Sequence, residues 1–206
     1  MHVGAYRGDA RRGTVGLRSA WQDNARTFLL LGHGHSMIVL DFETFSQAAI
    51  GKTGAYLYAS HPSTELLCLA YKADGEPTQL LTPGDLLQQD DLLSTGIPER
   101  LQRAIDDGEE FNAHNAFFER VVWYFQLHQK LGWPDIPPEL WTCSAAQAAA
   151  MSLPRDLAGA GAAIGLDMEK DKSGHRIMLK LSQPRKPSKL NLATRWTPEA
   201  VPADFE

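Results

Sequence analysis

The sequence predicts an α/β domain in which helices flank a mixed β-sheet. Three strand-like runs lie close together, and a helical segment then separates them from a fourth run. Runs that are rich in aliphatic and aromatic residues and bounded by Gly, Pro and Ser are typical of strands. Strands followed by a helix, another strand and further helices favour a mixed sheet.

The first three expected strands are residues 37–43 (MIVLDFE), 55–60 (AYLYAS) and 65–73 (ELLCLAYKA). The links between them are short, and short links suit antiparallel neighbours. We therefore expect these three segments to form an antiparallel meander.

A helix is expected over 98–108, because Pro98 and Gly108 supply a start and a stop around an amphipathic segment. The fourth expected strand, 110–114, follows directly. A helix between two strands permits them to lie parallel, so this strand is expected beside the first one. Residues that follow the two strands would then emerge at one edge of the sheet, where such folds place their chemistry.

Helical patterns dominate the next part of the chain. A helix is expected over 115–132, beginning at Asn115 and ending at Gly132. Its apolar residues recur at helical spacing and would face the core: Phe118, Val121, Val122 and Phe125. Two short helices rich in small residues are expected at 144–154 and 155–166.

The segment 169–191 is basic and has the character of a loop. Its cations are Lys170, Lys172, Arg176, Lys180, Arg185, Lys186 and Lys189. Such a cluster fits a loop that contacts a nucleic-acid backbone, with Lys180 as the first candidate, or an ordinary solvated basic face.

Residues 1–36 differ from the rest of the chain. They are rich in Gly and Arg and lack sustained periodicity, so we expect a poorly ordered N-terminal extension before one domain at 37–206. His33 and His35 could bind a transition metal, but no third ligand is evident, and a solvated loop is favoured.

The composition sets few limits on function. The formal net charge is -5 and the pI is about 5.8, so the chain has no global basic field. A local basic groove or bound metal ions could still accommodate a nucleic acid. Cys68 and Cys143 form no zinc pattern and are expected to be buried thiols in a reducing compartment, a disulfide being the less favoured alternative.

A membrane location is not expected. The longest apolar runs fall well short of the ~20 residues that a spanning helix needs. No small-residue cleavage site follows the short apolar run near residue 30, which argues against a signal peptide. A cytoplasmic location is therefore expected, without a membrane partner.

Two acids end the first expected strand. Asp41 and Glu43 are two residues apart and so point to the same face of an extended chain, while Phe42 points to the other. Acids after a strand often cap the next turn. Two carboxylates on one face repel each other unless a cation lies between them, which favours a metal site over a cap.

A second acidic motif begins the helix after the fourth strand. Glu119 lies one helical turn after Asn115, on about the same face. Alternatively, Asn115 caps this helix and Glu119 complements its dipole.

The motif "LDFET" resembles the first motif of the DEDD-type 3'-5' exonucleases, and "AHNAFFER" resembles their second, in which Asn precedes the acid by four positions. The likeness is closest to the proofreading domain of phage-type family A DNA polymerases, where Glu can replace the usual Asp. The segments "YASHPSTELLCLAY", "WTCSAAQAAAMSLPRDL" and "EKDKSGHRIMLKLSQPRK" are also similar. The resemblance covers most of 37–206 and implies a ribonuclease H-like fold.

The resemblance implies phosphodiester hydrolysis with two divalent cations, Mg²⁺ or Mn²⁺. Asp41 would bridge both ions, Glu43 would hold one, and Glu119 would serve the other, directly or through water. The nucleic-acid contacts it suggests are Thr44 and Asn115 at the terminal nucleotide and Phe45 or Phe118 against a base. Core packing is an equal alternative for the two phenylalanines. His114 is expected to pack or hydrogen-bond beside the motif and is a further binding candidate, as is Lys180.

The family's third motif has no counterpart in the C-terminal region. That motif places a Tyr or His a few residues before a fourth metal-binding Asp, and the last tyrosine here is Tyr124. The chain is therefore expected to be truncated before its last catalytic helix, with the polymerase domain downstream also absent.

The leading functional expectation is a phage or prophage proofreading-type exonuclease domain that acts on single-stranded or frayed DNA 3' ends. One alternative is an RNA-trimming exonuclease with the same site. Another is a truncated, non-catalytic nucleic-acid-binding module, since loss of the third motif makes activity of this chain uncertain.

Overall fold

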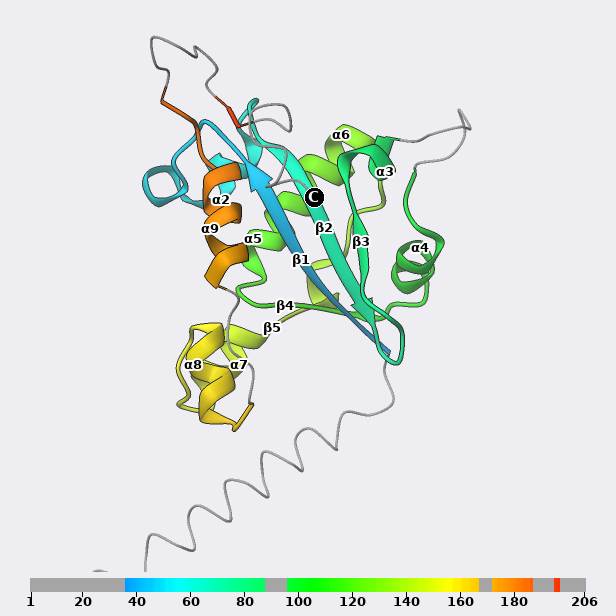
Figure 1. Ribbon diagram of the computed structural model, residues 1–206. Helices are drawn as coiled ribbons and strands as arrows, with labels where there is room; N and C mark the ends of the chain where they lie inside the picture. Colours follow the sequence, from blue (N-terminus) through cyan, green and yellow to red (C-terminus); the bar gives the residue numbers. More distant parts are fainter. Residues whose placement is uncertain (1–35, 88–95, 167–171, 187–194, 197–206) are drawn as a thin grey trace, which may run out of the picture. The chain divides into compact units, whose positions relative to one another are not determined.

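The computed structural model describes residues 36–87, 96–166, 172–186 and 195–196 (Figure 1). These residues contain a five-stranded sheet with the strand order β3-β2-β1-β4-β5. Antiparallel and parallel pairs occur in the same sheet, so the expected α/β fold is confirmed and is compatible with a ribonuclease H-like arrangement. The expected N-terminal extension, with His33 and His35, lies outside the described residues apart from Ser36.

Strand β1 (Met37–Phe45) occupies the centre of the sheet. It pairs antiparallel with β2 (Glu65–Ala73) and parallel with β4 (Glu110–Ala113). The short strands β3 (Gln79–Leu81) and β5 (Trp141–Cys143) lie at the two edges. Three of the four expected strands are therefore confirmed, including the parallel pair, whereas β3 and β5 were not expected.

The expected strand at 55–60 is wrong, because these residues complete helix α2 (Ile50–Ser60). Their tyrosines and leucine suit either structure, which explains the error. The neighbours Tyr58 and Ala59 are both buried, as one stripe of a helix allows and an alternating strand face does not. Gly54, at φ 76°, interrupts the helical geometry and shortens the periodic signal. The antiparallel meander therefore consists of β1, β2 and β3.

The core lies between the sheet and a long helical segment. That segment comprises α5 (Phe117–Val122), the π-helical turn η1 (Trp123–His128) and α6 (Gln129–Leu131). Ile38, Leu40 and Phe42 alternate with less buried residues along β1 and face this core. The ring of Trp123 lies at its centre and is within 6.4 Å, between centroids, of three other rings: Phe42, Phe111 and Trp133.

The long helix confirms the prediction at 115–132 except at its start. Gly132, at φ 73°, ends it as expected, and the four predicted core-facing residues are buried or partly buried against the core. The expectation that Asn115 begins the helix is wrong. Asn115 has a φ of 73°, a left-handed conformation that asparagine tolerates in turns, and the helix begins two residues later.

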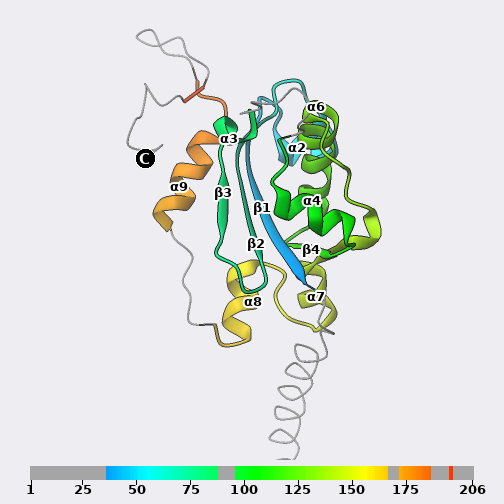
Figure 2. The same ribbon diagram turned by 90° about the vertical axis from the view of Figure 1, so that its right-hand side faces the viewer.

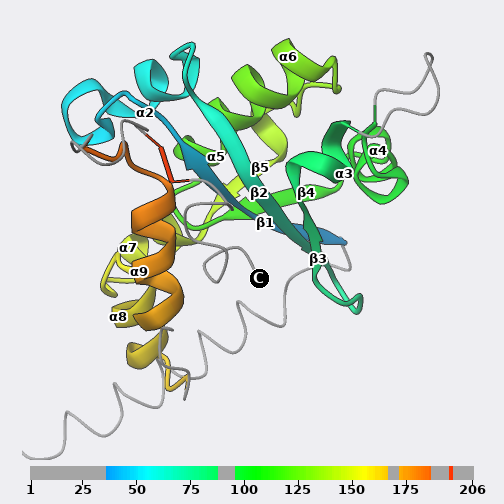
Figure 3. The ribbon, with the colours of Figure 1, turned by 45° about the horizontal axis from the view of Figure 1, so that its top comes forward.

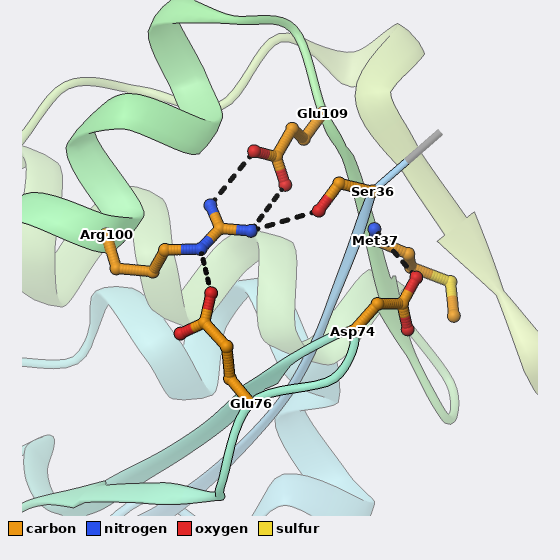
Figure 4. Close-up of polar contacts among 6 residues, drawn as sticks. All are labelled: Ser36, Met37, Asp74, Glu76, Arg100 and Glu109. Carbon is orange, nitrogen blue, oxygen red and sulfur yellow. Dashed lines mark hydrogen bonds and ion pairs between the residues drawn. The ribbon is translucent and has the colours of Figure 1, made fainter. Parts of the chain in front are cut away.

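The expected helix at 98–108 is present as α4 (Glu99–Asp106), after the short helix α3 (Pro83–Leu87). The guanidinium of Arg100 links α4 to three other segments (Figure 4). It donates to both carboxylate oxygens of Glu109 at 2.9 and 2.8 Å, to Glu76 at 2.9 Å and to the Ser36 hydroxyl at 3.0 Å. This cluster fixes the point at which the chain enters β1.

The C-terminal part of the described chain is helical. The expected small-residue helices are confirmed as α7 (Ser144–Ala150) and α8 (Leu157–Ala163), with a 3₁₀ turn, η2 (Pro138–Leu140), before β5. The expected loop at 169–191 is wrong, because its centre forms helix α9 (Lys172–Leu181). Its partly buried apolar residues Ile177, Met178 and Leu181 recur at helical spacing, a signal that the surrounding cations and Gly174 mask.

The helices divide between the two faces of the sheet. Figure 2 shows the sheet nearly edge-on, with α2, α4 and α6 on one side and α9 on the other. Helices α7, α8 and α9 gather on the same side of β1 in Figures 1 and 3. In the described ranges, no helix is long and apolar enough to cross a membrane. Cys68 and Cys143 are free thiols and half-buried.

Candidate functional site

A cleft of about 820 Å³ opens beside the second half of β1. Its walls come from β1, the turn after β4, and helices α7, α8 and α9. The lining residues are Asp41, Glu43, His114, Asn115, Ala145, Arg155, Asp156, Leu157, Gly174 and Met178. The two acids of the first motif and the turn of the second motif therefore meet at one place, as the parallel pairing of β1 and β4 predicts.

Asp41 and Glu43 lie on the face of β1 that the core does not cover. Asp41 is exposed and Glu43 is half-buried, whereas Phe42 between them is buried in the core. This confirms the alternation expected from the sequence. A β-bulge between Glu43 and Thr44 then breaks the register with β2, so Thr44 and Phe45 are both buried. The bulge thus sets the direction of the residues that end the strand.

Glu119 is the most unusual acid in the described chain. Its side chain is only 4% exposed, and its Oε2 atom is buried without a hydrogen-bond partner among the described residues. Burial is the main cause that raises its pKa, to about 8, and the charges of Asp41 and Cys143 raise it further. An acid of this kind is expected where a bound cation, or a proton, compensates the charge.

The turn between β4 and α5 holds His114 and Asn115 at the cleft. Nε2 of His114 lies 2.8 Å from the carbonyl oxygen of Arg155, and Nδ1 lies 3.0 Å from the Ser144 hydroxyl. A carbonyl can only accept, so Nε2 carries a proton and donates it to Arg155, while Nδ1 pairs with the Ser144 hydroxyl. Both ring nitrogens are therefore engaged, and His114 holds the cleft wall together, as expected of a residue that hydrogen-bonds beside the motif.

The remaining candidates lie outside the cleft lining. Thr44 is buried, with its hydroxyl 2.9 Å from the hydroxyl of Tyr58. Phe45 is also buried, and the half-buried Phe118 packs against the Tyr58 ring. Lys180 lies near the end of α9 with its Nζ over the ring of Trp196.

Sequence reasoning missed the wall formed by residues 155–157. Asp156 accepts a 2.8 Å hydrogen bond from the amide of Gly159 and so caps α8. An Asp before a run of small residues is an N-cap signal that could have placed it at the start of that helix. No sequence signal indicated that this cap would face β1.

Both thiols lie near the acids. Burial, and then the charges of Glu43 and Asp41, raise the pKa of Cys68, which is opposite Glu43 in the β1–β2 register. Burial alone would raise the pKa of Cys143 too, but backbone amides around its sulfur, first that of Ala146, lower the pKa below its ordinary value.

The donor chemistry at the cleft fits a hard cation, because carboxylate oxygens are the ligands that Mg²⁺ and Mn²⁺ prefer. Asp41 and Glu43 line the cleft, and Glu119 lies close enough to Asp41 to share its field. Within the described ranges, however, no three His, Cys, Asp or Glu side chains converge as a metal-binding group. The arrangement suits Mg²⁺ sites in which one or two carboxylates are completed by substrate phosphates and water.

No protein-family model matches the chain. The DNA polymerase of Bacillus phage SP02 is 33% identical over 171 residues, which make up 81% of this chain. The chain resembles part of a phage DNA polymerase. The aligned region is 24% of the phage protein, so the chain spans about a quarter of that relative's length.

Proposed function

We propose that this chain is a metal-dependent, proofreading-type 3'-5' exonuclease domain that hydrolyses phosphodiester bonds at single-stranded or frayed DNA 3' ends. The observation that carries the proposal is the buried Oε2 of Glu119, which has no partner among the described residues and lies in the field of Asp41, next to a cleft lined by Asp41 and Glu43. Without a cation or a proton, such a group is costly to bury. The similarity to a phage DNA polymerase supports DNA as the substrate.

The carboxylates would hold the cation. Asp41 and Glu43 present oxygens from one face of β1, and Glu119 approaches from α5, so the donors come from two elements. Mg²⁺ or Mn²⁺ bound there would neutralise a phosphate and make attack by water feasible near neutral pH. Binding of a cation also favours the ionised form of Glu119, against the effect of burial.

The other cleft residues would bind and orient the substrate. Asn115 lines the cleft and has a left-handed backbone conformation, and its side-chain amide can donate to a phosphate or sugar oxygen. His114 is committed to Ser144 and Arg155, so it serves as a support for this wall rather than as a base. Thr44 and Phe45 are buried and would act by shaping the end of β1.

The test is a cleavage assay on a 5'-labelled single-stranded DNA of about 20 nucleotides, which exceeds the site size of a typical single-strand groove. Products shortened stepwise from the 3' end are expected with Mg²⁺ or Mn²⁺, and none in a chelator. Asp41→Asn should lower the rate by about 10² or more. Asp107→Asn, an exposed acid after α4, is the matched control and should cut normally.

Internal cuts, or equal rates for Asp41→Asn and the control, would overturn the proposal. An RNA oligonucleotide of the same sequence decides between DNA and RNA trimming, because only contacts to the 2'-hydroxyl separate the two substrates.

A non-catalytic nucleic-acid-binding module is the second candidate. It is favoured by the lack of a three-ligand group within the described ranges. This function requires that the chain bind single strands in a chelator and leave them uncut when Mg²⁺ or Mn²⁺ is added.

A further inference from the structure

Positive charge is gathered in α9 and in the residues that follow it. Residues 172–198 contain seven Lys or Arg and no Asp or Glu, although the whole chain carries a net charge of -5. This asymmetry gives one segment a field opposite to that of the protein as a whole.

Two cations of this segment share one aromatic ring. Nζ of Lys180, near the end of α9, lies 4.6 Å from the centroid of the Trp196 ring, and Cζ of Arg185 lies 4.8 Å from it. Cation–π contacts of this length hold the two side chains in place over the ring. Nη1 of Arg185 is buried and has no hydrogen-bond partner among the described residues.

The next cation connects this group to the sheet. Arg195 lies over the ring of Phe45, with Cζ 4.5 Å from the centroid, and pairs with Glu65 at the start of β2. Phe45 is the last residue of β1, two positions after Glu43. The segment 195–196 therefore lies between α9 and the end of the strand that carries the two acids (Figures 1 and 3).

We propose that Lys180, Arg185, Arg195 and Trp196 form a cationic–aromatic surface that binds the phosphates of a nucleic-acid single strand upstream of the terminus held in the cleft. The inference rests on the proposed exonuclease function. It adds a second contact region, away from the reacting phosphate. One of its residues, Lys180, lies on α9, the helix whose Gly174 and Met178 line the cleft.

The chemistry of the surface favours a single strand over an acidic protein or a lipid. Guanidinium groups that lie over rings can contact phosphates and stack with bases, and aromatic rings interleaved with cations are typical of single-strand grooves. A duplex would hide its bases and offer only its backbone.

The test is the affinity for a fluorescent single-stranded DNA of about 12 nucleotides, within the site size of such grooves, measured by anisotropy in a chelator. The double variant Lys180→Ala/Arg185→Ala should bind about tenfold more weakly, and the slope of log Kd against log salt should fall by about 0.7 for each phosphate that the variant no longer neutralises. Lys72→Ala/Arg103→Ala removes the same charges from exposed positions on β2 and α4 and should leave both quantities unchanged. Trp196→Ala should weaken binding, and Trp196→Phe should restore most of it.

Equal losses of affinity in the two double variants would show a general effect of net charge and would overturn the proposal that this surface binds a single strand. Equally tight binding of a duplex of the same length, or of heparin, would overturn the single-strand assignment. The two proposals can also fail separately. If the wild type cleaves DNA in an Asp41-dependent manner but Lys180→Ala/Arg185→Ala binds normally, the proposed binding surface is wrong and the exonuclease proposal stands. If the surface variants lose binding but the wild type never cleaves with Mg²⁺ or Mn²⁺, the surface stands and the exonuclease proposal fails.

Discussion

The hydroxyl of Thr44 lies 2.9 Å from the hydroxyl of Tyr58, and both side chains are buried. This bond joins the last turn of α2 to the end of β1, directly after the bulge that follows Glu43. Its neighbours reinforce the link. The Thr64 hydroxyl donates to the carbonyl oxygen of Tyr58, and Nε2 of Gln126 donates to that of Ala59 at 2.7 Å. A buried polar network therefore lies behind the candidate metal ligands.

We expect Tyr58→Phe to lower the free energy of unfolding by about 1–3 kcal/mol, because it leaves the Thr44 hydroxyl buried without its partner. Tyr56→Phe, in the exposed part of the same helix, should change it by less than about 0.5 kcal/mol. The double variant Thr44→Val/Tyr58→Phe should lie closer to the wild type than either single variant, since no buried polar group is then left over. Denaturant unfolding of the wild type, of Tyr58→Phe, Thr44→Val and Tyr56→Phe, and of the double variant measures these differences. Strictly additive single effects would contradict this account.

Glu119 should make stability depend on pH. Its pKa rises from 4.5 to about 8 on folding, so its contribution is complete below pH 4.5 and is lost as the pH rises through 8. In a chelator, wild-type stability relative to Glu119→Gln should fall by about 1.4 kcal/mol per pH unit across that window and then level off. Urea unfolding at several pH values measures the difference. A difference that does not vary with pH would mean that Glu119 titrates normally in the folded protein.

Arg100 should contribute more to the free energy of unfolding than the exposed cation of the same helix, Arg103. Replacing it by Met leaves Glu109, whose side chain is 14% exposed, without its bidentate partner, at a cost of about 2–3 kcal/mol (Figure 4). Arg103→Met, on the exposed side of the same helix, is the control. Hydrogen bonding to Arg100 lowers the pKa of Glu109, so the wild-type advantage is present above the ordinary Glu pKa and disappears as the pH falls through the lowered value. Urea unfolding of the three proteins measures it, and an equal cost for both variants would contradict this role.

The two thiols should react at different rates. Cys143, with a lowered pKa, should be alkylated by iodoacetamide at lower pH than Cys68, whose pKa is raised by burial and then by Glu43 and Asp41. Glu43→Gln should speed the reaction of Cys68, because it removes a negative charge that opposes the thiolate. Peptide mass spectrometry resolves the two sites, and Asp107→Asn serves as the control for a general change in charge. If Glu43→Gln leaves Cys68 unchanged, the thiol does not sense the acid across the β1–β2 pair.

The sequence was most informative where local pattern and tertiary position agree. Strand β1 could be predicted because it begins with a run of four apolar residues, and the place of β4 followed from the helix before it. The segment 55–60 could not be predicted, because its apolar residues suit a strand or a helix. The choice depends on tertiary contacts: the ring of Tyr58 packs against Phe118 of α5, and η1 donates a hydrogen bond to the carbonyl oxygen of Ala59. Helix α9 was not predicted because its many cations are typical of a solvated loop. Its helical apolar pattern becomes clear only when those residues pack against the rest of the domain.

The acidic residues of the candidate site could be predicted from the sequence, whereas the residues that wall the cleft could not. Asp41, Glu43 and Glu119 stand in motifs with fixed local spacing, whereas Arg155, Asp156 and Met178 reach the cleft only through the packing of α8 and α9. The burial of Oε2 in Glu119 likewise depends on contacts that no spacing rule contains.

The pairing of β1 also bears on the order of folding. Its antiparallel partner β2 begins 20 positions after β1 ends, whereas its parallel partner β4 begins 65 positions after it. Closing the longer loop costs more chain entropy, so the β1–β2 pair should form first and the docking of β4 should limit the rate. Glu119 lies beyond β4 in the chain. A polypeptide still emerging from the ribosome can therefore expose Asp41 and Glu43 on a formed hairpin well before their third acidic neighbour arrives, and the cleft becomes competent only once the helices that wall it have been made.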